Sequence, residues 1–189
     1  MLKQSVTSEA ADRSVRGQEK IGVLLMNLGT PEGTSFRETR RYLKEFLSDP
    51  RVIETNRVLW WIILNGIVLT TRPGRSGRAY AKIWNQARNE SPLKTITREQ
   101  SERLQDAFED REDLIVEWGM RYGQPPIAAR LVGLRERGCD RILLAPLYPQ
   151  YSAASTGTAL DVAYEGLRTL RWQPAIRTLP PYYDRPAYV

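Results

Sequence analysis

The chain has 189 residues, of which 41% are hydrophobic and 26% charged. This length and composition fit one domain with its own core and exclude a disordered or collagen-like chain. It contains no histidine and a single cysteine, Cys139. A Ser-His or Cys-His catalytic pair, an internal disulfide and a thiolate metal cage are therefore excluded, and we expect no catalytic residue and no metal site within these residues.

The formal net charge is +6, and one segment carries the whole surplus. Residues 37–82 contain ten basic and four acidic side chains. Such a local basic field attracts phosphate, anionic lipid or a carboxylate ligand, and charge alone does not distinguish among them. A solvated surface without a ligand is the alternative.

Residues 1–20 are polar and without an apolar period, which predicts a flexible N-terminal extension. An α/β domain is expected over residues 21–185, and residues 186–189 are predicted to start a further helix. The first and third of four strand-like runs are almost continuously apolar, as strands covered on both faces are. The four runs are 21–28, 113–120, 140–147 and 174–179.

Helical patterns separate these strands. Ser35 and Glu38 fit a capping box, and Ser91 followed by Pro92 fits the start of a second helix. A third helix is predicted from Pro126 to Arg137, and a fourth with Ser155 or Thr156 as its N-cap. Strands that alternate with helices in this way predict a doubly wound parallel sheet of four strands.

Open parallel sheets bind ligands at the carboxyl ends of their strands. The loops expected there are rich in Tyr, Ser, Thr and Arg, and they include residues 121–125 and 148–155. Neither G-x-G-x-x-G nor G-x-x-x-x-G-K-[ST] occurs, so a nucleotide site of the common kinds is not predicted.

An uncharged, mostly apolar run of 14 residues, Val58 to Thr71, is shorter than the roughly 20 apolar residues that a membrane-spanning helix needs. On composition alone, a fully buried core helix is the favoured interpretation of its apolar part. However, Arg57 precedes the run, and residues 72–75 are expected to form a basic turn after it. This layout also fits a membrane-interface lip formed by Trp60, Trp61, Ile62 and Ile63, or an apolar wall for a planar ligand with carboxylates.

Five motifs in order resemble the ferrochelatase family over about residues 21–185. They are MNLGTPEG at 26–33, TRPGR at 71–75, ESPL at 90–93, GMRYG at 119–123 and LYPQYSAASTG at 147–157. The resemblance implies the first chelatase-type domain of a normally two-domain fold. It also implies a lyase of heme biosynthesis that inserts ferrous iron into protoporphyrin IX to form protoheme.

The resemblance also assigns porphyrin-binding residues. Leu28 would lie against one face of the macrocycle, and Arg72, Arg75, Tyr80 and Ser91 would hold its propionates, as an apolar cleft with charge-assisted donors at its mouth requires. Three residues would line the macrocycle: Arg121, Tyr122 and Tyr148. Ser152 and Ser155 belong to the matching loop. For each of these residues a purely structural role is the alternative: solvation for the arginines, packing for the tyrosines and helix capping for Ser91.

The family's histidine and its acidic partner are expected beyond residue 189, so we expect an N-terminal half that is inactive alone. Ferrous iron is implied as substrate and no resident cofactor is predicted, with an iron–sulfur cluster left open. The expected partner is protoporphyrin IX or a related dicarboxylate or tetracarboxylate porphyrin, in the cytoplasm and peripheral to a membrane. A non-catalytic tetrapyrrole-binding module is the alternative. A basic nucleic-acid-binding domain is disfavoured, because no such motif is visible.

Overall fold

The computed structural model describes residues 20–189. The predicted extension, except for Lys20, lies outside these residues. Four strands form one sheet in which every pairing is parallel, in the order β2-β1-β3-β4. The strands are β1 (Lys20–Gly29), β2 (Leu114–Tyr122), β3 (Cys139–Pro146) and β4 (Ala175–Thr178). The predicted α/β fold with a four-stranded parallel sheet is confirmed.

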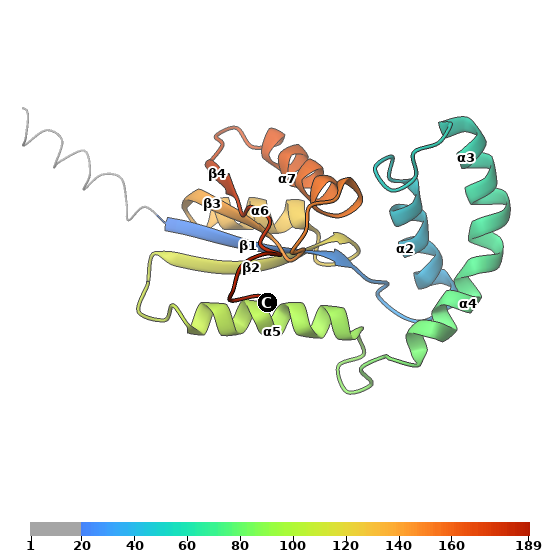
Figure 1. The fold of residues 1–189 in the computed structure, drawn as a ribbon, viewed down its shortest axis with the longest axis horizontal. Helices are drawn as coiled ribbons and strands as arrows, with labels where there is room; N and C mark the ends of the chain where they lie inside the picture. Colours follow the sequence, from blue (N-terminus) through green and yellow to red (C-terminus); the bar gives the residue numbers. More distant parts are fainter. Residues whose placement is uncertain (1–19) are drawn as a thin grey trace, which may run out of the picture.

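Helices cover both faces of this sheet (Figure 1). Successive side chains of a strand point to opposite faces. Leu24 and Met26 of β1 accordingly pack with α6 (Ile127–Glu136) and α7 (Thr158–Arg168). Val23 and Leu25 instead join the cluster on the other face, which Leu104 of α5 (Pro92–Asp106) helps to cover. The continuous apolar sequence of β1 thus reflects burial on both sides.

Local capping signals place two helices where the sequence predicts them. α2 (Phe36–Ser48) begins with the capping box of Ser35 and Glu38, and the Ser91 side chain caps α5, whose first residue is Pro92. The predicted cap of α7 is wrong. A π-helical turn, η2 (Ala153–Gly157), precedes α7, and the side chain of Ser152 caps this turn. Ser155 and Thr156 lie inside η2, and the N-cap residue of α7 is Gly157.

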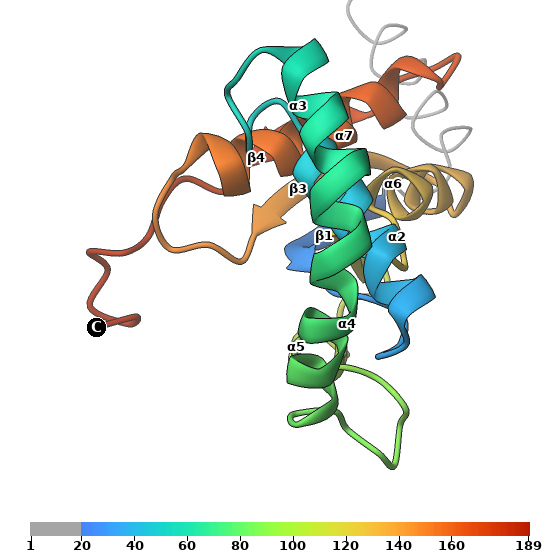
Figure 2. The same ribbon diagram turned by 90° about the vertical axis from the view of Figure 1, so that its right-hand side faces the viewer.

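The uncharged run belongs to a long helical rod, formed without interruption by α3 (Arg57–Ile63), η1 (Leu64–Val68) and α4 (Leu69–Ala81). Figure 2 shows this rod in front, with α2 beside it. The rod is not a buried core helix, because only Leu64 and Leu69 of the apolar run are buried. Its exposed apolar side chains are Val58, Leu59, Trp61, Ile62 and Ile67.

The basic turn expected after this run is also wrong, because residues 72–75 lie inside α4. Pro73 cannot donate a backbone hydrogen bond to the carbonyl of Leu69, four residues earlier. Arg40 of α2 supplies a replacement, because its Nε lies 3.2 Å from the Leu69 oxygen. The Arg40 side chain therefore satisfies the Leu69 carbonyl, which has no backbone donor at position 73.

The end of β2 and the last residues of the chain were also predicted from the sequence, and the structure describes both. β2 extends to Tyr122, so Arg121 and Tyr122 belong to a strand rather than to the expected loop. Residues 186–188 form a turn, in which the amides of Tyr188 and Val189 both donate to the carbonyl of Arg185. Among the described residues, no helix combines the length and the apolar character needed to cross a membrane.

Candidate functional site

Side chains from the sheet and from the rod meet at the carboxyl end of β1 and β2. Leu28 of β1 is partly buried in one apolar cluster with Tyr122 of β2 and Tyr80 of α4. Gly29 permits the close approach of the two strands, since its φ is +105° and a Cβ atom there would lie 1.8 Å from the Tyr122 oxygen. Three of the predicted site residues are thereby brought together.

Tyr42 of α2 joins these residues, although the sequence analysis missed it. Its ring contacts that of Tyr80 edge-on, with 6.3 Å between centroids, and stacks on Phe46 at 6.0 Å. Burial, followed by the neighbouring hydroxyls of Tyr80, Tyr122 and Tyr148, raises the pKa of Tyr42 well above its usual value. The only sequence signal was the aromatic pair at positions 42 and 46, four residues apart on one helix face.

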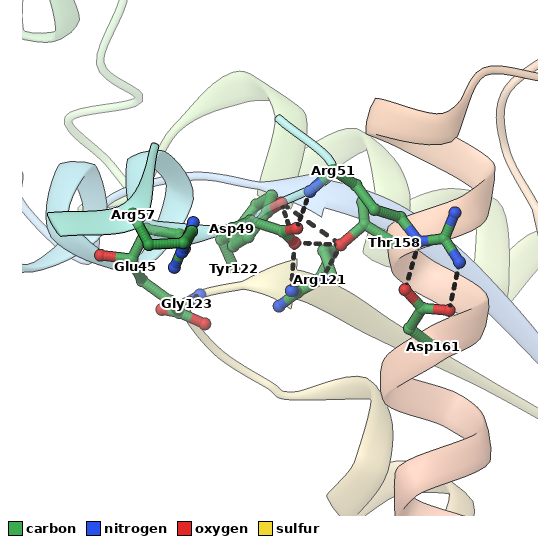
Figure 3. Close-up of polar contacts among 10 residues, drawn as sticks. Glu45, Asp49, Arg51, Arg57, Arg121, Tyr122, Gly123, Thr158 and Asp161 are labelled. Atoms are coloured by element: carbon green, nitrogen blue, oxygen red, sulfur yellow. Dashed lines mark hydrogen bonds and ion pairs between the residues drawn. The ribbon is translucent and has the colours of Figure 1, made fainter. Parts of the chain in front are cut away.

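A buried polar cluster around Asp49 includes the hydroxyl of Tyr122 (Figure 3). Asp49, the C-cap of α2, accepts hydrogen bonds from Arg121, Tyr122 and Thr158, with 2.8 Å to the Tyr122 hydroxyl. The backbone amide of Arg51 donates a fourth, at 2.8 Å. These contacts join the end of α2 to β2 and to the first residue of α7, so the cluster fixes the relative positions of these three elements.

The protonation of this cluster follows from its contacts. Burial alone would raise the pKa of Asp49, but the hydrogen bonds from Thr158, Arg51 and Tyr122 and the charge of Arg121 lower it below its usual value. Burial is the main cause that raises the pKa of Tyr122 to about 12. At neutral pH the cluster therefore contains an ionised Asp49, a cationic Arg121 and a neutral Tyr122.

Two contacts extend the cluster at its edges. Arg51 forms an ion pair with Asp161 of α7. Glu45 of α2 accepts from the amide of Gly123 at 3.2 Å, and its burial raises its pKa. Both carboxylates are thus engaged with neighbouring groups.

Arg72 and Arg75 differ from Arg121. Both are exposed on α4, one turn apart, and neither forms a hydrogen bond or ion pair with another residue between 20 and 189. Two exposed guanidinium groups at this spacing can receive the carboxylates of a ligand.

The predicted serines lie at the starts of helices. Ser91 is 2% exposed, and its Oγ accepts from the amide of Lys94 at 3.3 Å as the cap of α5. The exposed Ser152 accepts from the amide of Ala154 at 3.2 Å. Ser155 lies half-buried within η2. The capping role of Ser91 is thus present, and the structure shows no contact that joins these three hydroxyls to the arginines.

Tyr148 lines a cavity of about 210 Å³ beyond the end of β3, where Leu160 of α7 and Leu179 after β4 form apolar walls. Its hydroxyl is buried and has no hydrogen-bond partner within the described part of the chain. Burial, together with the nearby Tyr122, raises its pKa above the usual value, although the charge of Arg121 opposes this shift. Tyr148 therefore combines a side chain that lines an apolar cavity with a buried hydroxyl that has no partner among the described residues.

In open parallel α/β domains, ligands bind at the carboxyl ends of the strands, and Leu28, Tyr80 and Tyr122 of this chain gather there. Within residues 20–189 no group of three or more carboxylate or cysteine side chains is arranged to hold a metal ion. The comparisons with known proteins identify the family of the chain.

The family model for ferrochelatase matches residues 20–189, and the chain belongs to the ferrochelatase family. An alignment that covers 90% of the chain shows 59% identity to a ferrochelatase of Agrobacterium fabrum. An alignment that covers 95% of the chain shows 58% identity to a ferrochelatase of Mesorhizobium japonicum. A ferrochelatase of Rhizobium meliloti is 56% identical over 92% of the chain. The chain spans about half the length of these relatives, 49%, 51% and 51% respectively.

Proposed function

We propose that this chain forms the porphyrin-binding part of a ferrochelatase, the lyase that inserts ferrous iron into protoporphyrin IX in heme biosynthesis. Membership of the family supports the reaction class. The observation that carries the binding role is the meeting of Leu28, Tyr80 and Tyr122 in one cluster, next to the arginine-bearing helix α4. Apolar and aromatic groups would contact the macrocycle, and the arginines its carboxylates.

In this proposal Leu28 contacts a face of the porphyrin ring. Arg72 and Arg75 donate charge-assisted hydrogen bonds to the propionates, because both are exposed and lack partners among the described residues. Tyr80 orders the same end of the site through its ring contact with Tyr42. Tyr148, whose buried hydroxyl has no partner among the described residues, would line the porphyrin site from the end of β3.

Metal insertion also requires a base that accepts two pyrrole protons, and the chain contains no histidine. We therefore propose that these 189 residues bind porphyrin but insert little or no metal alone. The test is zinc or iron insertion by the purified chain, followed by porphyrin absorbance. A rate comparable to that of a full-length relative would contradict this statement.

Binding is tested by the quenching of porphyrin fluorescence. Arg72→Leu combined with Arg75→Leu should weaken protoporphyrin IX binding by about tenfold, as expected for the loss of one or two charge-assisted contacts, and should affect its dimethyl ester far less. Arg168→Leu with Arg171→Leu removes the same charge from exposed positions at the end of α7 and is the control. Equal losses for acid and ester would rule out the propionate role.

Two alternatives have distinct outcomes in these assays. A non-catalytic tetrapyrrole-binding module would bind porphyrin in the same way, but joining it to the second half of a full-length relative would restore no metal insertion. A basic nucleic-acid-binding domain would instead shift DNA in a salt-dependent manner and leave porphyrin fluorescence unchanged.

We further propose that the rod contacts a membrane surface from the cytoplasm, as a peripheral lip. Trp61 is 66% exposed and Ile62 56%, whereas Trp60 and Ile63 are half-buried. Trp61→Ser with Ile62→Ser should lower co-sedimentation with anionic vesicles. Trp172→Ser, which removes an exposed ring from outside the rod, is the control. Unchanged co-sedimentation of the double variant would argue against the lip.

A further inference from the structure

Asp49 occupies a central position that no sequence motif indicates. Its side chain is only 4% exposed, and that of Arg121 is 15% exposed. A carboxylate in such surroundings must be compensated by donors, and Asp49 has four: Arg121, Tyr122, Thr158 and the amide of Arg51. The carboxylate is therefore built into the site rather than left over at its surface.

Arg121 is restrained from three directions. Its Nε donates to the Thr158 hydroxyl, another of its nitrogens donates to Asp49, and its guanidinium lies 4.3 Å from the centroid of the Tyr122 ring. Thr158 itself donates to Asp49. The positive charge of Arg121 is thus balanced within the cluster, whereas Arg72 and Arg75 have no such partner within residues 20–189.

We propose that Asp49 is a positioning residue that decides which arginines receive the carboxylates of the ligand. By neutralising and fixing Arg121, it leaves the carboxylates to Arg72 and Arg75 and so sets the orientation of the ring. A cation that is already paired with a nearby carboxylate attracts a second anion only weakly. This inference rests on the proposed porphyrin-binding function.

The test compares the same arginine substitutions in two backgrounds. Arg72→Leu with Arg75→Leu is expected to reduce the preference for protoporphyrin IX over its dimethyl ester by about tenfold in the natural background. In an Asp49→Asn background, Arg121 becomes a further donor to the ligand carboxylates, and the reduction should be less than about threefold. An equal reduction in both backgrounds would overturn the proposal.

A spectroscopic signal shows whether Asp49 acts through Arg121. In ¹⁵N-labelled protein, the Nη2–H resonances of Arg121, whose nitrogen donates to Asp49, should be protected from solvent exchange, and Asp49→Asn should remove most of that protection. Asp161→Asn is the matched control, because it removes the neighbouring carboxylate of the Arg51 ion pair without touching Arg121. Unchanged protection in the Asp49 variant would also overturn the proposal.

A neutralised pair keeps the proposal falsifiable should Asp49→Asn alone not fold. Asp49→Asn with Arg121→Gln removes both charges together and avoids an isolated buried ion. If Arg121 contributes little to carboxylate binding, this double variant keeps the preference for protoporphyrin IX over its dimethyl ester. A loss of that preference as large as in the Arg72 and Arg75 variant would contradict the proposal. Absence of porphyrin binding by the natural chain would refute the proposed function, and the carboxylate assignment with it, while the Arg121 resonance would still show whether Asp49 fixes that side chain.

Discussion

Two apolar segments of similar composition differ in how they are buried. In residues 21–28, the middle of β1 is buried on both faces, between α6 and α7 on one side and α5 on the other. In residues 58–69, only Leu64 and Leu69 are buried. The strand lies between two layers of helices, whereas the rod packs mainly on α2 and can bury only one side. Apolar composition therefore indicates burial only where the fold supplies neighbours on every side.

The largest effect should come from truncating a side chain in β1. Leu24 is 0% exposed, and Leu24→Ala should lower the free energy of unfolding by about 2–5 kcal/mol, because it removes buried methyl groups and leaves a cavity. Urea denaturation measures this change. Ile62→Ala in the exposed part of the rod, the matched control, should stay within about 0.5 kcal/mol. Similar losses in the two variants would contradict the contrast between the segments.

A second prediction concerns the polar junction between α2 and the sheet. Asp49→Asn should destabilise the chain by about 1.5–3 kcal/mol at neutral pH, since it weakens several hydrogen bonds to a charged group. The folded pKa of Asp49 lies below its usual 3.8, so its contribution is present above about that pH and is lost as the pH falls through the lower folded value.

The natural chain and the Asp49 variant should therefore converge in stability as the pH is lowered below about 4. Denaturation with urea at a series of pH values measures the difference. Asp161→Asn serves as the comparison, because the side chains of its ion pair with Arg51 are 40% and 47% exposed, and a solvent-screened pair contributes little to stability. A difference for Asp49→Asn that persists unchanged at the lowest pH would contradict the assigned ionisation.

The sequence predicted those features that depend on neighbouring residues. The four strands, the cap at Ser91 and the capping box at Ser35 follow from local patterns, and the structure confirms them. The Asp49 cluster was not predictable, because the three side chains that donate to Asp49 lie 72 to 109 positions further along the chain. Nor was the exposure of Trp61, which depends on how little of the fold covers the rod. The assignment of the porphyrin-binding residues remains a prediction.

The smallest effect distinguishes two adjacent tryptophans of the rod. The indole nitrogen of Trp60 donates to the carbonyl of Leu47 at 2.7 Å, which ties the rod to the end of α2, whereas Trp61 is exposed. Trp60→Phe should therefore cost about 0.5–1.5 kcal/mol, the usual value of one hydrogen bond. Trp61→Phe should leave the free energy of unfolding nearly unchanged. Because the two substitutions are chemically identical, equal effects would mean that the rod does not present these two rings differently, and the lip would then have to be assigned to other side chains.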